Sequence, residues 1–233
     1  MKKIIAFIPN ALTLCNLLCG LASIFSAFTG SMKYALLFII IAAVFDFLDG
    51  FAARLLKAYS EVGLQLDSLC DMVSFGVAPA FMLTLTSVMI TSSVAPLWMA
   101  FIPAIIALGA AYRLAVFNVD TTQSTEFRGL PTPAMALFIG SLSAYIIPEC
   151  GTTQLWSYLI PVIALLVTLL MVCRIPMFSF KFKDFSLKHN LLKYLFAIFS
   201  VIVVILLGIG LALSVIIASY ITLSVVIWLT KKV

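Results

Sequence analysis

Long apolar stretches are the feature that most limits what this chain can fold into. A helix that crosses the hydrocarbon core of a bilayer needs about 20 consecutive, mostly apolar residues. Of the 233 residues, 64% are hydrophobic and 10% are charged, whereas a soluble domain carries roughly a quarter charged residues. We therefore expect an all-α integral membrane protein with about eight transmembrane helices. The expected spans are residues 10–29, 33–57, 64–90, 97–117, 131–148, 155–173, 192–209 and 211–230.

The last two spans are divided at a pair of glycines. Residues 192–230 form one continuous, mostly apolar stretch that is interrupted at Gly208 and Gly210. This stretch is too long for one crossing and long enough for a tight helical hairpin. We expect a single polytopic domain over residues 1–233, with a catalytic core at about 1–150 and carboxy-terminal helices at about 155–233.

The positions of the basic residues predict the orientation. With eight spans, the side that holds both termini receives every one of the 14 basic residues except Lys33. Basic residues concentrate in cytoplasmic loops, so we expect cytoplasmic termini and a multi-pass protein of the cell (inner) membrane. Because no cleavage-site pattern precedes the first apolar stretch, we expect that stretch to be retained. No basic patch occurs outside short loops, which argues against nucleic acid as a partner.

Three other features have ordinary interpretations. The five cysteines show no metal-ligand spacing, and we interpret them as small buried apolar residues. The basic, aromatic loop 174–190 suits either a segment lying on an anionic membrane surface or an ordinary cytoplasmic loop. Its His189, the sole histidine, is interpreted as an uninvolved surface residue.

Five of the nine acidic residues fall within residues 46–71, between two apolar stretches. Asp46 and Asp49 are three apart near the inner end of the second span. Asp67 and Asp71 are four apart near the inner start of the third span, so each pair shares one helix face. At 1.5 Å per residue, Asp46 and Asp71 lie roughly 10–16 Å below the same surface.

Four carboxylates that converge in a low dielectric repel one another and lose hydration. Arg54 supplies one positive charge at most, and hard oxygen ligands suit Mg²⁺ or Mn²⁺. The cluster therefore predicts a divalent-metal site, and four carboxylates suit two ions. The alternative is that the acids stay protonated or pair with Arg54. Gly50, Ala53 and Gly63 remove side chains beside the acids, which leaves room for a phosphate-bearing group.

The spacing of these residues is D-x2-D-G-x2-A-R-x8-G-x3-D-x3-D. It resembles the signature of the CDP-alcohol phosphotransferase family at all eight fixed positions. The residues that fill it are Asp46, Asp49, Gly50, Ala53, Arg54, Gly63, Asp67 and Asp71.

Three further stretches resemble the branch of this family that uses serine as the acceptor alcohol. They are PNALTLCNLLCG (9–20), YRLAVFNVD (112–120) and FRGLPTPAMA (127–136). The family commonly has a second arginine in the middle stretch, where this chain has Val116, so Arg113 is the candidate there.

The resemblance implies CDP-diacylglycerol as donor, L-serine as acceptor and the following roles. Asp46, Asp49 and Asp67 would bind metal, and Asp71 would bind metal and act as general base. The CDP site would comprise Asn10, Thr13, Asn16, Gly50, Ala53, Arg54 and Gly63. The acceptor site would comprise Arg113, Asn118, Arg128 and Gly129. A homodimer is a possible assembly.

Several of these roles have plainer alternatives. Asn10, Thr13 and Asn16 also suit helix capping and back-bonding, and Arg113 and Arg128 also suit inner-loop charge. Glycerol 3-phosphate or an inositol phosphate is the rival acceptor, but a phosphorylated alcohol would need several converging cations. A cation transporter would spread its acids across the membrane, whereas the outer halves of the expected spans carry only Glu149 at a boundary.

Overall fold

The computed structural model describes residues 2–91, 96–119, 129–151, 153–177 and 187–230, and every element in them is a helix. The expected all-α membrane fold is confirmed. Six of the described helices are long and apolar enough to cross a membrane. They are Phe7–Phe28, Met32–Leu55, Glu61–Thr91, Leu97–Val119, Gln154–Val172 and Asn190–Thr230.

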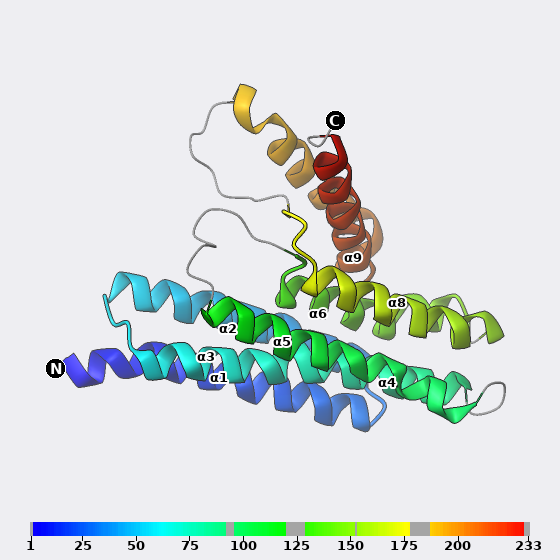
Figure 1. The fold of residues 1–233 in the computed structure, drawn as a ribbon, viewed down its shortest axis with the longest axis horizontal. Coiled ribbons are helices and arrows are strands. Elements are labelled where there is room, and N and C mark those ends of the chain that lie inside the picture. Colours follow the sequence, from blue (N-terminus) through cyan, green and yellow to red (C-terminus); the bar gives the residue numbers. More distant parts are fainter. Residues whose placement is uncertain (1, 92–95, 120–128, 152, 178–186, 231–233) are drawn as a thin grey trace.

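The helices run back and forth along the long axis of the molecule (Figure 1). α1, α2, α3 with α4, and α5 follow one another in alternating directions, and α6 and α8 form a further pair beside them. The amino terminus and the α2–α3 turn lie at the same end. The elements of the first half are α1 (Lys2–Phe28), α2 (Met32–Leu55), α3 (Glu61–Asp71), η1 (Met72–Val77), α4 (Ala78–Thr91), η2 (Leu97–Ala104) and α5 (Ile105–Val119). Those of the second half are α6 (Thr132–Ser141), η3 (Leu142–Ile146), α7 (Ile147–Glu149), α8 (Gln154–Val172) and α9 (Leu187–Thr230).

Helix α9 folds back on itself at Gly208, whose φ of 71° and ψ of 160° are not helical. The rings of Phe196 and Tyr220 lie with their centroids 6.4 Å apart, whereas an unbroken helix would separate these residues by about 36 Å. The two legs are visible side by side in Figure 1, steeply inclined to the other helices. The expected helical hairpin is confirmed, while the number of crossings and the side of the termini stay predictions.

Two wide helical turns interrupt the rods, and each precedes a proline. η1 and η3 have π-helical geometry, in which the N–H of Ala78 bonds to Val73 O and that of Ile147 bonds to Leu142 O. Pro79 and Pro148 come next in each case. A proline has no N–H and its ring clashes with the carbonyl four residues earlier, so a locally wider turn lets the helix continue.

Small residues bring the helices together, as expected where lipid offers no hydrophobic drive for helix association. A Cβ on Gly109 would lie 2.6 Å from Thr168 Cγ2 of α8. A Cβ on Gly76 would lie 3.0 Å from the Ala110 side chain of α5. These close approaches pack η1 against α5 and α5 against α8.

A polar clamp joins α9 to α6. Ser141 Oγ donates to Gly210 O at 2.5 Å, and Ser214 Oγ donates to Ser141 Oγ at 2.7 Å. Gly210 packs against the ring of Tyr145, over which the Lys33 ammonium lies 5.0 Å from the centroid. The hairpin is therefore attached to α6 and η3 through its turn.

Candidate active site

The acidic residues of α2 and α3 converge as the sequence predicts. Asp46, Asp49 and Asp67 each offer one carboxylate oxygen, and these oxygens lie within 4.8 Å of one another. Asp49 is buried, and Asp46 and Asp67 are half-buried. Helical spacing of three residues on α2 turns both of its acids toward α3. Three carboxylates in this space form a concentrated negative site toward the end of the bundle where the amino terminus and the α2–α3 turn lie.

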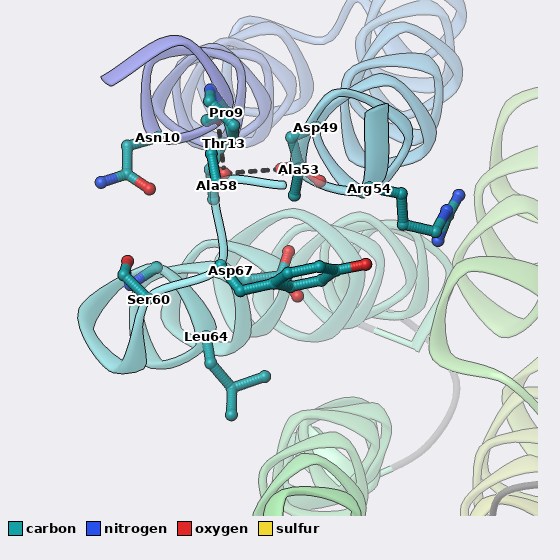
Figure 2. Close-up of a pocket in the computed structure, with 13 residues that line it drawn as sticks. Pro9, Asn10, Thr13, Asp49, Ala53, Arg54, Ala58, Ser60, Leu64 and Asp67 are labelled. Atoms are coloured by element: carbon teal, nitrogen blue, oxygen red, sulfur yellow. Dashed lines mark hydrogen bonds between the residues drawn. The ribbon is translucent and has the colours of Figure 1, made fainter. Parts of the chain in front are cut away.

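Helix α1 contributes two hydrogen-bond donors to this cluster, one to each acidic helix. Thr13 Oγ1 donates to Asp49 Oδ2 at 2.6 Å and also lies 3.0 Å from Pro9 O (Figure 2). Asn16 Nδ2 donates to Asp71 Oδ1 at 2.9 Å. Because Thr13 and Asn16 are three residues apart on one face of α1, this helix holds the α2 and α3 carboxylates in register.

The residues fit a divalent cation. The donor set is all carboxylate oxygen, as hard cations such as Mg²⁺ and Mn²⁺ prefer. Asp67 Oδ1 is buried and has no hydrogen-bond partner among the described residues, and a buried polar atom of this kind usually has a partner. Arg54 is exposed and makes no ion pair with the acids within the described part of the chain. Neutralisation by Arg54 therefore has no support in the structure.

Asp71 lies slightly apart from this group. It is buried, with 9% of its surface exposed, and is not one of the three carboxylates that share the 4.8 Å cluster. One of its oxygens is occupied by the Asn16 amide. The four-ligand arrangement and the role of Asp71 as base stay predictions.

A pocket of about 310 Å³ opens beside the carboxylates, between α1, α2 and the start of α3. Figure 2 shows Asn10 at one end of it and Arg54 at the other. Six of the seven residues expected to bind CDP line this pocket, and Asn16 does not. The lining residues are Pro9, Asn10, Thr13, Asp49, Gly50, Ala53, Arg54, Ala58, Tyr59, Ser60, Gly63, Leu64 and Asp67.

The two glycines that line the pocket, Gly50 and Gly63, have different effects on packing. A Cβ on Gly63 would lie 2.9 Å from Ser60 Oγ and 3.0 Å from Asn10 Oδ1, so glycine lets α1 approach the start of α3. Ser60 caps this helix by accepting the Gly63 N–H at 2.9 Å. At Gly50 the nearest atom to a Cβ would be Arg54 Nη1, at an ordinary 3.7 Å. Gly50 leaves open space there, as the sequence predicts.

The expected acceptor residues lie outside this lining. Arg113 Nη1 donates to Met171 O at 2.8 Å, at the end of α8. Gly129 packs against the segment that follows α8, because its N–H donates to Ile175 O at 2.8 Å. Its φ of 71° favours glycine at this position. Asn118 instead faces α3, where its amide lies 2.9 Å from Ser68 Oγ. Arg128, the remaining expected residue, falls outside the described residues.

The structure adds residues that sequence reasoning did not select. Tyr59, Ala58 and Ser60 line the pocket from the α2–α3 turn. The helix-capping spacing of Ser60 before the third span was a usable signal. No sequence signal pointed to Ser68, because its hydrogen bond with Asn118 joins residues 50 apart in the sequence.

The chain matches the family model for CDP-alcohol phosphatidyltransferases over residues 6–173. This match runs from the first turns of α1 to the end of α8 and includes every motif position of the carboxylate cluster and the pocket.

Curated relatives carry a more specific description. One is the CDP-diacylglycerol–serine O-phosphatidyltransferase of Bacillus subtilis (strain 168), 37% identical over 141 residues that cover 59% of this chain and 75% of the relative. The enzyme of the same description from Helicobacter pylori (strain J99) is 32% identical over 194 residues, 81% of this chain and 78% of the relative. The archaetidylserine synthase of Methanothermobacter thermautotrophicus is 37% identical over 147 residues, 60% of each chain.

Proposed function

Because this chain belongs to the CDP-alcohol phosphatidyltransferase family, we propose that it transfers the phosphatidyl group of CDP-diacylglycerol to the hydroxyl of L-serine. The products are phosphatidylserine and CMP. The observation that carries the proposal is the meeting of Asp46, Asp49 and Asp67 beside a pocket lined by the motif residues of α1, α2 and α3. Similarity to relatives described as serine phosphatidyltransferases supports serine as the acceptor.

The carboxylates are the residues that would hold Mg²⁺ or Mn²⁺, with Asp71 completing the set for two ions. Bound there, divalent cations supply positive charge that neutralises the pyrophosphate and the departing CMP. The protein's own part is to keep the acids in place, which Thr13 does for Asp49 and Asn16 does for Asp71.

The nucleotide is assigned to the pocket between α1, α2 and α3. Asn10 and Ser60 offer polar side chains at one side, and Arg54 offers a guanidinium at the other. Gly50 and Gly63 leave the backbone accessible to phosphate oxygens. The pocket lies next to apolar helix surfaces, so the acyl chains of the donor can stay in lipid while its head group enters.

Asp71 is assigned the proton transfer. It takes the proton of the serine hydroxyl, the hydroxyl oxygen bonds to the phosphorus that carries diacylglycerol, and the bond from that phosphorus to CMP breaks. Arg113, Asn118, Arg128 and Gly129 are assigned to the acceptor, with an arginine for the serine carboxylate. The active site is placed on the cytoplasmic face of the cell membrane, and a homodimer stays a prediction.

The test is an acceptor screen with purified protein and CDP-diacylglycerol, in which CMP release is measured. We expect release with serine in Mg²⁺ or Mn²⁺, and no release in excess EDTA until metal is restored. Glycerol 3-phosphate and an inositol phosphate serve as competing alcohols. If either outperforms serine, the family chemistry stands and the acceptor is wrong. If full turnover persists in EDTA with metal content confirmed as nil, the metal assignment is wrong.

A further inference from the structure

We propose that Asn16 is a positioning residue for Asp71, so that it controls the rate of the transfer step and not the binding of the nucleotide. This inference rests on the proposed function, in which Asp71 takes the acceptor proton. The resemblance that groups Asn16 with Asn10 and Thr13 implies a different role, contact with CDP. The structure separates Asn16 from those two residues.

The first observation is where the Asn16 side chain lies. Asn10 and Thr13 line the nucleotide pocket, whereas Asn16 does not and is fully buried, at 0% exposure. Its Nδ2 donates to Asp71 Oδ1 at 2.9 Å. A ligand in the pocket would therefore meet Thr13 before it met Asn16, whose amide instead donates to the carboxylate of Asp71.

The second observation is that the backbone of Asn16 is itself held by the helix that carries Asp71. Ser74, three residues after Asp71, donates from Oγ to Asn16 O at 3.0 Å and is fully buried. Gly20 lies one turn beyond Asn16 and leaves room for the Ser74 side chain, because a Cβ on Gly20 would overlap Ser74 Oγ. Asn16 and Asp71 are thus joined by a side-chain bond and by a backbone bond through Ser74.

The third observation is an unsatisfied atom. Asn16 Oδ1 is buried and has no hydrogen-bond partner among the described residues. Leaving a buried amide oxygen without a partner lowers stability, so an apolar residue of similar size would serve packing better. The polarity of Asn16 is explained by the amide N–H that it presents to Asp71.

The consequence for chemistry follows from geometry. With Oδ1 held by Asn16, Asp71 has a fixed orientation, and the two lone pairs of its other oxygen are left for a metal ion and for the serine hydroxyl. Proton transfer needs donor and acceptor atoms within hydrogen-bond reach, and a misplacement of about 1 Å can cost about a hundredfold in rate. Losing the Asn16 amide should therefore lower kcat and leave the donor KM nearly unchanged.

The experiment compares Asn16→Ala and Asn16→Asp with Thr13→Val, using CMP release at varied donor and serine concentrations. We expect Asn16→Ala to lower kcat by about ten- to a hundredfold, with the KM for CDP-diacylglycerol within about twofold of the wild type. Asn16→Asp keeps the size but replaces the donor N–H with a second carboxylate, so it should be at least as slow. Thr13→Val, which removes a pocket residue, should raise the donor KM.

Ser74→Ala is the milder variant, since it deletes one hydroxyl and leaves Asn16 intact. We expect a fall in kcat of severalfold without a change in donor KM. The Kd for CDP and the melting temperature report whether each variant retains its fold and its pocket. A raised donor KM with unchanged kcat in Asn16→Ala would overturn the proposal and restore the nucleotide role. Near-normal kcat in Asn16→Asp would overturn it as well. Failure of the wild type to release CMP with any alcohol would instead count against the proposed function.

Discussion

At the scale of single residues, Asp71 differs from the other three aspartates in its position and its hydrogen bonding. It is buried beside the three-carboxylate cluster, and one of its oxygens is already bonded to Asn16. We predict that Asp71→Asn lowers kcat by about 10²–10⁴-fold, the usual contribution of a general base, while the protein still binds CDP. Asp49→Asn should instead weaken metal and CDP binding together, because Asp49 lines the pocket. Steady-state kinetics with CDP titration separates the two, and near-normal turnover in Asp71→Asn would place the base elsewhere.

The two candidate arginines of the acceptor site should behave differently. Arg113 donates to the carbonyl of Met171 at the end of α8, so Arg113→Ala leaves that carbonyl without this donor and should lower the melting temperature. Arg128→Ala should raise the serine KM by about ten- to a hundredfold, the cost of one charge-assisted contact of about 1.5–3 kcal/mol. Thermal unfolding measures the first effect, and titrating serine at saturating donor gives the serine KM of both variants. If neither variant raises the serine KM, the carboxylate of serine is bound by another residue.

The aspartates and the polar residues of α1 show which parts of the site the sequence predicts and which it does not. The i, i+3 and i, i+4 spacing of the aspartates was enough to place them on facing sides of two antiparallel helices. The same reasoning placed Asn10, Thr13 and Asn16 together, because they share a face of α1. It did not separate Asn16 from the other two. That separation depends on the rotation of α1 against α3, which Ser74 and Gly20 determine through contacts between residues far apart in the sequence.

At the level of whole helices, the turn of the α9 hairpin offers a matched pair of glycines. A Cβ on Gly210 would overlap the Tyr145 ring, whereas a Cβ on Gly208 would meet nothing within 4 Å. Gly208 instead has a φ of 71°, which side chains disfavour. We predict that Gly210→Ala destabilises the protein by about 1–3 kcal/mol through overpacking. Gly208→Ala should cost about 1–3 kcal/mol through backbone strain, because φ 71° with ψ 160° is a region that essentially only glycine adopts.

The two effects are distinguished by a second substitution. Tyr145→Leu should relieve Gly210→Ala, because it removes the ring that the new methyl group meets, and should not relieve Gly208→Ala. Thermal unfolding in detergent provides the measurement. The kcat at saturating substrate should stay unchanged, since neither glycine lines the pocket beside the carboxylates. Equal relief of both variants by Tyr145→Leu would contradict the assigned causes.

The boundaries of the helices show what local sequence predicts and what it does not. The break at Gly208 was expected from the glycines alone. The π-helical turns before Pro79 and Pro148 were not, because residues 64–90 and 131–148 read as uninterrupted apolar stretches. α3 begins at Glu61, three residues before the expected start, because Ser60 supplies its cap. Hydropathy finds spans by length, whereas caps and proline-linked turns depend on individual hydrogen bonds.

For the molecule as a whole, the positions of the basic residues predict its orientation in the bilayer. Of the 14 basic residues, Lys33 alone falls on the side opposite the termini when eight spans are counted. The structure is consistent with that count in two places, since α9 forms a hairpin and residues 132–149 form a continuous helical rod. An even number of crossings returns the carboxy terminus to the side of the amino terminus. The carboxylates would then face the cytoplasm. Serine and CMP, which are both water-soluble, could enter and leave the site from that side.

We therefore predict that the α2–α3 turn is cytoplasmic and the α1–α2 turn is not. Single cysteines at Leu56 and Thr29, both exposed turn positions that leave every lysine and arginine in place, report the two sides in a background without the other cysteines. A membrane-impermeant maleimide should label Thr29→Cys in right-side-out vesicles and Leu56→Cys only in inside-out vesicles. The natural Cys150 is exposed at the end of α7, so the expectation that all five cysteines are buried is wrong for this residue. It is a matched control expected to label with Thr29→Cys, because α1 and α6–α7 run in the same predicted direction. Labelling of Leu56→Cys from the outside would reverse the orientation. Labelling of Cys150 and Thr29→Cys from opposite sides would instead show that the number of crossings between them is wrong.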